Sequence, residues 1–244
     1  LAFWSDIESN KPILTAGQPV VDAPFIIPLR GTGAGSGRSI AWNMVGDPFP
    51  FDVPFNALLV DTPSGRISLQ DAVNRGYVLP NLFSYSAAEG YTFRTLPDGA
   101  IRAWQGHWIG VTSAADLALV VPPVPVTRAA NISKTNIVGN GGWQVQFGVS
   151  SRGMRDSNIL VGVSSRAADS YDRLDVPKPP LVSPYVSLGV QHSDWNNRNG
   201  LYATDYRSAT GSKVWTLVAD SDQKNTDVSV TWNLQGVPRN TRMM

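Results

Sequence analysis

Alternation of apolar and polar residues is clearest in the segment from Gly142 to Pro180. Trp143, Val145 and Phe147 fall on one side of a period-2 pattern, which predicts a half-buried strand. Ile159–Val163 is a second apolar run, and closely spaced prolines then hold the chain extended. Because a single strand cannot bury its apolar side alone, we expect this segment to pair with further strands.

Short apolar runs separated by Gly, Pro and Asn turns continue through most of the chain. This spacing predicts an all-β protein with two β-sandwich or jelly-roll-like lobes and one short helix. The prolines of Pro122–Pro125 predict a stiff extended linker. We therefore expect an N-terminal extended segment over residues 1–29, a first lobe over 30–123 and a second lobe over 127–244.

The predicted helix begins after Ser68. A serine at this place is a good N-cap, and Asp71 follows three residues later as a short version of the capping box. Apolar residues recur between Leu69 and Val73 at helical spacing, and Gly76 then gives a C-terminal stop signal. The sequence predicts that this is the one substantial helix of the first lobe.

The segment from Ile13 to Leu29 is interrupted by prolines. Proline lacks the N–H that a central strand must donate, so we expect an edge strand or a strand that passes to a neighbouring molecule. In the second case, alternate apolar side chains would fill pockets on the open sheet edge of another copy. The side chains expected to do so are Phe3, Trp4, Ile13, Phe25 and Ile27. Pairing within the same chain is the alternative.

Composition excludes several classes of function. The 244 residues carry a formal net charge of +1, and charged residues make up only 16% of the chain, so we expect no nucleic-acid partner and no polybasic contact with a membrane. There is no cysteine, which excludes disulfides and thiolate metal sites. The longest apolar runs are short and broken by proline, so no membrane span is predicted. No signal peptide is visible at Leu1.

Residue patterns typical of catalysis are missing from the sequence. The two histidines, His107 and His192, belong to no H-E-x-x-H pair, and no G-x-S-x-G motif occurs. His107 lies in an aromatic segment and is predicted to be a packing residue. His192 precedes Asp194 closely enough to form a base and orienter pair, but the sequence places no nucleophile beside it. We therefore predict a protein that is not an enzyme.

Three carboxylates, Asp169, Asp172 and Asp175, recur at intervals of three in one loop. Oxygen ligands at short intervals in a loop are what Ca²⁺ requires, so these residues are a candidate calcium site. The alternative is that the aspartates form Asx-turns and cap the local backbone. The glycine of a D-x-D-x-D-G loop is missing, which favours the second interpretation, and we expect no other cofactor.

Eight tryptophans raise the question of carbohydrate binding, because indole faces stack on sugar rings. Most of them alternate with other apolar residues and are predicted to be core residues. These are Trp143, Trp215 and Trp232. The tryptophans that border polar loops are candidate glycan contacts. These are Trp104, Trp108 and Trp195.

Two runs resemble modules of a known kind. Ala41–Pro50 and Trp104–Trp108 resemble the repeated "GWNxxGNPFP … WxGYW" modules of large bacterial secreted and surface proteins. Trp143–Pro180 is similar to the β modules that often accompany them. Asp47 departs from the usual asparagine and His107 from the usual tyrosine. The resemblance implies an ancillary extracellular or cell-surface module, and the modules supply no catalytic residues to transfer.

The N-terminus has a second resemblance. Ala2–Ser9 and Thr15–Gly17 are similar to the "AxFSDxExS … TAG" start of TasA/camelysin-type matrix-fibre proteins, which assemble by passing an N-terminal strand to the next subunit. It covers about the first seventeen residues. Together, these features predict a non-enzymatic bacterial structural protein, a subunit of a fibre, pilus-like filament or surface layer that binds copies of itself by strand exchange. The alternative is a polysaccharide-binding or ancillary β module of a secreted hydrolase.

Overall fold

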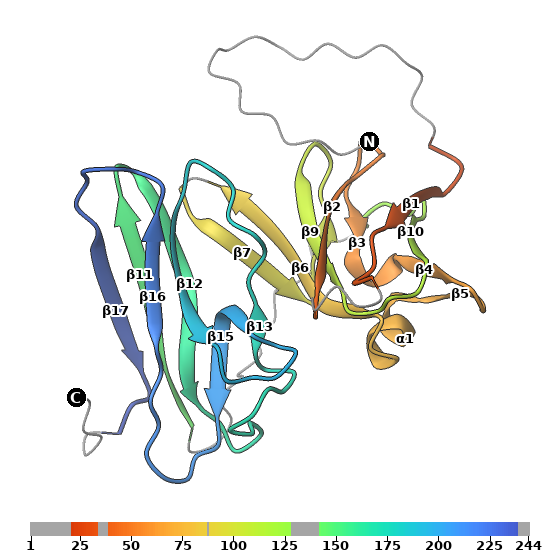
Figure 1. Cartoon of the computed structure of the whole chain (residues 1–244). Coiled ribbons are helices and arrows are strands. Elements are labelled where there is room, and N and C mark those ends of the chain that lie inside the picture. The colour runs from red at the N-terminus through yellow and green to blue at the C-terminus, as the bar shows by residue number, and fades with distance from the viewer. Residues whose placement is uncertain (1–20, 34–38, 87, 128–141, 239–244) are drawn as a thin grey trace. The chain divides into compact units, whose positions relative to one another are not determined.

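The structure is a computed structural model that describes residues 21–33, 39–86, 88–127 and 142–238. Within these ranges the protein is all-β with a single short α-helix, as the sequence predicts. The described residues form two compact units (Figure 1). Unit 1 contains the described residues up to Ser84 and from Phe93 to residue 127, and unit 2 contains Tyr85–Thr92 and residues 142–238.

Unit 1 is built from two four-stranded sheets and a two-stranded one. The strand orders are β1-β10-β4-β5, β2-β9-β6-β7 and β3-β8, and neighbouring strands are antiparallel in β1-β10, β10-β4, β4-β5, β2-β9, β9-β6 and β3-β8. The strands are β1 (Phe25–Leu29), β2 (Ala41–Gly46), β3 (Val53–Pro54), β4 (Leu59–Thr62), β5 (Gly65–Ser68), β6 (Val78–Ser86), β7 (Gly90–Thr95), β8 (Ala100–Ile101), β9 (Gly106–Val111) and β10 (Leu117–Val121). A 3-10 turn, η1 (Phe55–Ala57), follows β3.

The core of unit 1 consists of inward residues of these strands, of η1 and of the segments that join them. Phe55, Leu58, Ile109 and Leu119 have no exposed surface, and they belong to one apolar cluster. The segment around Asp47 lies beside this core, where the Asp47 carboxylate accepts the Phe49 N–H at 2.8 Å. The apolar residues of these segments therefore pack into one interior, and this packing fixes the positions of the turns between them.

The helix α1 (Leu69–Asn74) is confirmed with the predicted cap. The Ser68 hydroxyl oxygen accepts the backbone N–H of Asp71 at 3.0 Å and donates its proton to the Asp71 carboxylate at 2.7 Å. Gly76 has a φ of +70°, the left-handed conformation that ends many helices. Leu69 and Ala72 point into the core of unit 1.

The edge strand predicted near Leu29 is β1, and it pairs with β10 of its own chain. Phe25 lies opposite Val121 and Ile27 opposite Leu119. Phe25 and Ile27 therefore pair within their own chain along one side of β1, which is the alternative that the sequence left open. The other residues predicted for the exchanged strand lie outside the described residues. These are Phe3, Trp4 and Ile13.

Unit 2 is built around one seven-stranded sheet. Its strand order is β16-β14-β15-β12-β11-β17, and β13 pairs with β15 beside this path. Only β12 and β15 run parallel among the pairs described. The strands are β11 (Trp143–Ser151), β12 (Met154–Val163), β13 (Val176–Pro177), β14 (Val186–His192), β15 (Gly200–Arg207), β16 (Leu217–Ser221) and β17 (Ser229–Gln235).

The sheet of unit 2 folds over itself. β14 contacts both β11 and β12, although neither is its neighbour in the sheet. Val145, Val149 and Ile159 are buried on one side and Leu188 and Val190 on the other, which gives the unit a sandwich-like interior. A folded sheet of this kind still has two edges, and here they are β16 and β17 (Figure 1).

Candidate functional site

The edge strand β17 is exposed along its whole length. All seven of its residues are exposed, whereas β11, its one neighbour, is largely buried or half-buried. The exposed fractions of Val230, Trp232 and Leu234 are 44%, 65% and 45%. The prediction that Trp232 is a core residue is therefore wrong, because β11 is its only neighbour among the described strands.

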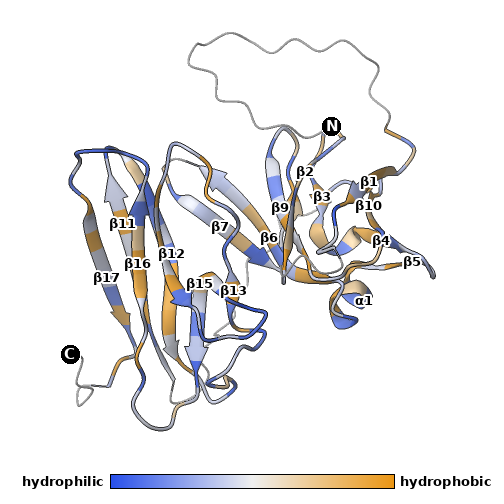
Figure 2. Ribbon diagram, in the orientation of Figure 1, coloured by the Kyte–Doolittle hydropathy of each residue, from blue (hydrophilic) through white to orange (hydrophobic). Residues whose placement is uncertain are grey.

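The apolar residues of β17 share one face of the sheet. Val230 lies opposite Val149, Trp232 opposite Phe147 and Leu234 opposite Val145. Directly opposed residues point to the same side of a sheet, so this row continues the apolar interior of unit 2 outward to its edge. Apolar and polar positions alternate along β17 in Figure 2, and the polar row is Ser229, Thr231, Asn233 and Gln235.

β17 lacks the features that usually protect an edge strand. Ser229–Gln235 contains no charged residue and no proline. Natural edge strands are commonly protected by an inward charge, a proline, a bulge or a covering loop. Among the described residues, the outer side of the strand therefore has no partner strand and lies beside exposed apolar side chains, a combination through which other proteins bind a further strand.

A second exposed site is the turn between β8 and β9. Trp104 is 89% exposed, and its φ of 65° lies in the left-handed region that bulky residues rarely adopt. Arg102 and Gln105 on the same turn are also exposed. An indole held in this way offers an open π-face with polar groups beside it.

The Trp104 turn is held by hydrogen bonds to two side chains, those of His107 and Asp52. The backbone N–H of Arg102 donates to Nε2 of His107 at 3.0 Å, and the N–H of Ala103 donates to the Asp52 carboxylate at 3.0 Å. Nε2 is therefore an acceptor, so the ring proton lies on Nδ1, 3.0 Å from the Ser84 hydroxyl. Burial lowers the pKa of His107 to about 4, which keeps the ring neutral. His107 is thus the packed residue that the sequence predicts.

The other two candidate glycan tryptophans are half-buried. Trp108 lies on β9 opposite Met44 and Phe83. Trp195 stacks on the His192 ring, with 3.4 Å between the ring centroids. Neither indole presents a free face comparable with that of Trp104.

The three aspartates predicted for calcium are used by the backbone instead. Asp172 accepts the N–H groups of Ala168 and Leu174, each at 2.7 Å. Asp169 pairs with Lys213 at 2.7 Å. Within the described ranges no three His, Asp or Glu side chains gather to hold a metal ion. The Asx-turn alternative accounts for these residues, and the calcium site is a correction.

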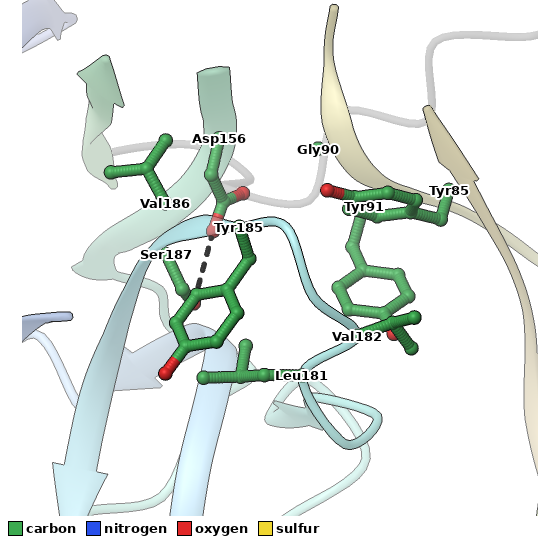
Figure 3. A pocket seen from close by; sticks show the side chains of 9 residues that line it. All are labelled: Tyr85, Gly90, Tyr91, Asp156, Leu181, Val182, Tyr185, Val186 and Ser187. Atoms are coloured by element: carbon green, nitrogen blue, oxygen red, sulfur yellow. Dashed lines mark hydrogen bonds between the residues drawn. The ribbon is translucent and has the colours of Figure 1, made fainter. Parts of the chain in front are cut away.

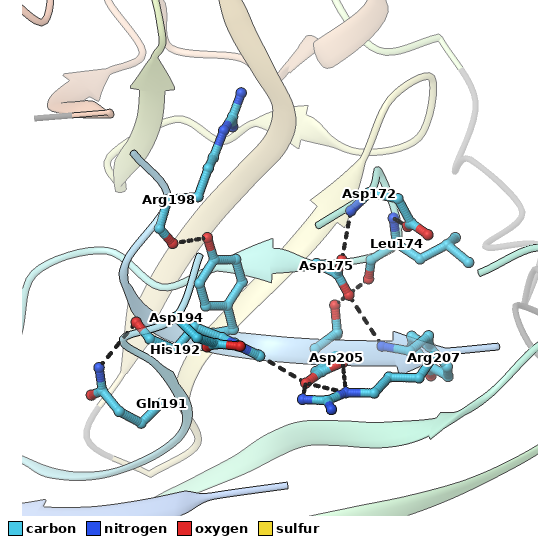
Figure 4. A network of polar contacts seen from close by, with 12 residues as sticks. Asp172, Leu174, Asp175, Gln191, His192, Asp194, Arg198, Asp205 and Arg207 are labelled. Carbon is cyan, nitrogen blue, oxygen red and sulfur yellow. Dashed lines mark hydrogen bonds and ion pairs between the residues drawn. The ribbon is translucent and has the colours of Figure 1, made fainter. Parts of the chain in front are cut away.

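Asp175 belongs to a buried polar network (Figure 4). Its carboxylate accepts the N–H of Asp172 at 2.7 Å and that of Tyr206 at 3.1 Å. Burial nevertheless raises its pKa to about 8. Nearby, His192 lies between two carboxylates, with Nδ1 3.1 Å from Asp194 and Nε2 2.9 Å from Asp205.

The His192 and Asp194 pair expected from the sequence therefore exists, but both ring nitrogens are already occupied. Asp205 also pairs with Arg207 at 3.0 Å. His192, Asp194, Asp205 and Arg207 therefore pair with one another within unit 2.

A small cavity in unit 2 lies next to the buried Lys178–Asp156 ion pair. The Lys178 ammonium donates to the Asp156 carboxylate, to the Ser187 hydroxyl at 3.0 Å and to the Leu188 carbonyl at 2.6 Å. The cavity volume is about 10 Å³, which is room for about one water molecule. It is lined by Tyr85, Gly90, Tyr91, Asp156, Leu181, Val182, Tyr185, Val186 and Ser187 (Figure 3). The cavity is too small for an organic substrate.

Comparisons with known proteins give no family. No family model, no curated protein and no solved structure matches this chain. No helix in the described part of the chain is long and apolar enough to cross a membrane. The function must therefore be argued from the exposed edge β17 and from the Trp104 turn.

Proposed function

We propose that this chain is a non-enzymatic structural protein of the bacterial exterior that assembles with copies of itself through the edge strand β17. The observation that carries the proposal is the row of Val230, Trp232 and Leu234, exposed on a strand with neither charge nor proline. Backbone pairing at such an edge provides affinity, and burial of the apolar row adds to it.

The role of β17 replaces the predicted role of the N-terminal strand. β1 pairs with β10 inside the chain, so Phe25 and Ile27 already belong to a sheet of their own unit. The proposed contact uses the opposite end of the described chain and a different unit. Assembly through copies of itself is retained, and the strand that mediates it is changed.

The test is a matched pair of valine substitutions. Val230→Lys places a charge in the apolar row of β17, and Val214→Lys places the same charge at a residue that is 77% exposed and lies outside the strands. We expect the unchanged protein and Val214→Lys to associate as concentration rises in sedimentation velocity, and Val230→Lys to remain monomeric. A protein that stays monomeric at high concentration without either substitution would overturn the proposal.

The alternative function, polysaccharide binding, is supported by one observation, the fixed and exposed indole of Trp104. The neutral His107 ring and the Asp52 carboxylate hold the turn before any ligand arrives, which lowers the entropy that binding must offset. The ligand would be a polysaccharide whose pyranose ring stacks on the indole.

Affinity electrophoresis in gels that contain single polysaccharides tests this function. Trp104→Ala is expected to abolish any retardation, whereas Trp232→Ala, which removes an exposed indole from unit 2, is expected to leave it unchanged. If no polysaccharide of a broad panel retards the protein, or if the two substitutions have equal effects, the Trp104 turn is not a glycan site.

A further inference from the structure

We infer that the partner of β17 is the β17 of a second copy, paired antiparallel about a two-fold axis that passes through Trp232. This inference rests on the proposed function and specifies its geometry. It makes the assembly unit a dimer in which the two seven-stranded sheets join into one continuous sheet.

Side-chain parity limits the registers that two copies of β17 can adopt. Directly opposed residues of an antiparallel pair point to the same face, so the apolar row continues across the contact only when even-numbered residues oppose even-numbered ones. In Ser229–Gln235 this condition places the two-fold axis at a residue and not between two residues.

The requirement that the two strands overlap along their whole length then places the two-fold axis at one residue. With the axis at Trp232, the centre of the seven-residue strand, all residues of β17 gain a partner. Val230 opposes Leu234, Thr231 opposes Asn233, and the two Trp232 side chains oppose each other. Cross-strand aromatic pairs of this kind stabilise antiparallel sheets, and the apolar area that Trp232 exposes is partly buried.

The charges on β17 permit a contact between identical strands. A strand that carries a charge near its centre opposes like charges when it pairs with itself, which is unfavourable. Ser229–Gln235 carries none, and the nearest charged residue before it is Asp227. In the proposed register Asp227 lies beyond the end of the paired region. A partner of opposite charge is not required by any residue of this edge.

The other edge of the sheet is less suited to be the partner. β16 has five residues, and Val218 shares its face with Asp220. The Asp220 carboxylate already accepts the Tyr185 hydroxyl at 3.0 Å. Pairing of β17 with β16 of another copy would be shorter and would propagate head to tail, whereas pairing of β17 with itself closes after two copies.

Cysteine cross-linking in the full chain tests the register, because the sequence has no native cysteine. Thr231→Cys and Asn233→Cys are prepared as separate proteins, one with a mass tag, and oxidised alone and as a mixture. In the proposed register residues 231 and 233 oppose each other, within disulfide reach. We therefore expect the mixed dimer to form at least tenfold faster than either homodimer. Val214→Cys mixed with Asn233→Cys is the control for random collision.

The outcomes separate the register from the proposed function. A dimer with preferential 231–233 cross-linking supports the inference. Two results would overturn the two-fold register: the protein forms open filaments, or each cysteine variant cross-links to itself as fast as the mixture does. If Val230→Lys still abolishes association in these cases, the proposed function is left intact. A protein that is monomeric at all concentrations overturns both the register and the proposed function. Both are also overturned if residues 1–20 of the same chain protect the β17 amides, which would be measured as a loss of hydrogen-exchange protection when these residues are removed.

Discussion

The two units of this protein both bury apolar side chains, but they differ in the charged groups that they bury and in the apolar row that one of them exposes. Unit 1 buries one continuous apolar cluster, whose members include Phe55 and Leu119. Unit 2 buries charged groups, namely the Asp156–Lys178 pair and the Asp205 network, and at the same time exposes an apolar row on β17. Unit 2 thus buries charges within an otherwise apolar interior, and its exposed row remains available to a partner.

The first way to test this contrast is to remove a side chain from the core of unit 1. Phe55→Ala is expected to lower the free energy of unfolding of this unit by about 3–5 kcal/mol, because it leaves a cavity in a closely packed apolar cluster. Hydrogen exchange resolved by peptide measures each unit separately. Trp104→Ala, at an exposed position of the same unit, is the control and should change stability by less than about 0.5 kcal/mol. Equal losses in both units would contradict the contrast.

A second test breaks the buried ion pair of unit 2. Lys178→Met leaves the Asp156 carboxylate buried without its cation, so we expect this unit to lose about 3 kcal/mol. The double variant Asp156→Leu/Lys178→Met removes both charges and should recover most of the loss, because well-packed apolar groups can replace a buried ion pair. Hydrogen exchange of unit 2 peptides measures both effects. A double variant as unstable as the single one would show that the pair contributes more than charge compensation.

The third test concerns the one buried histidine of unit 1, His107. Burial lowers its pKa from 6.5 to about 4, so between these values the unfolded chain binds a proton that the folded chain does not. Its contribution to stability is complete above pH 6.5 and is lost as the pH falls toward 4, by up to about 3 kcal/mol. We expect His107→Gln to remove this part of the pH dependence, measured by urea unfolding at several pH values. Identical pH profiles for the two proteins would refute it.

The smallest effect is expected at the exposed row itself. Trp232→Ser should change the free energy of unfolding of the monomer by less than about 0.5 kcal/mol, because most of the side chain is already in water. The same substitution should weaken association strongly. Sedimentation and urea unfolding at low concentration measure the two quantities. A loss of several kcal/mol in the monomer would show that Trp232 acts within the unit and not at a contact.

The fold class and the helix could be predicted because their signals are local. Period-2 alternation predicts strands wherever they pair, and the Ser68 cap depends on residues three positions apart. Even the burial of His107 follows from its aromatic neighbours. These features require no knowledge of which strands lie side by side.

The open edge could not be predicted, because it depends on the order of strands in the sheet. The alternation of Val230, Trp232 and Leu234 is as regular in the sequence as that of Val145 and Phe147. Only pairing separates them, since β11 has a neighbour on each side and β17 has one. The hydrogen bonds of the aspartate loop could not be predicted for a related reason. Asp172 accepts a backbone N–H from its own loop, and Asp175 accepts one from β15.

The pairing of β11 with β17 also sets the order in which unit 2 is completed during synthesis. Val145 lies near the start of this unit's main segment, and its partner Leu234 lies on the last strand described. At about 5–20 residues per second, the stretch between the two strands takes roughly 4–16 s to leave the ribosome. Throughout that interval the apolar edge of β11 is uncovered, so nascent chains on one messenger are most prone to pair with each other before β17 arrives.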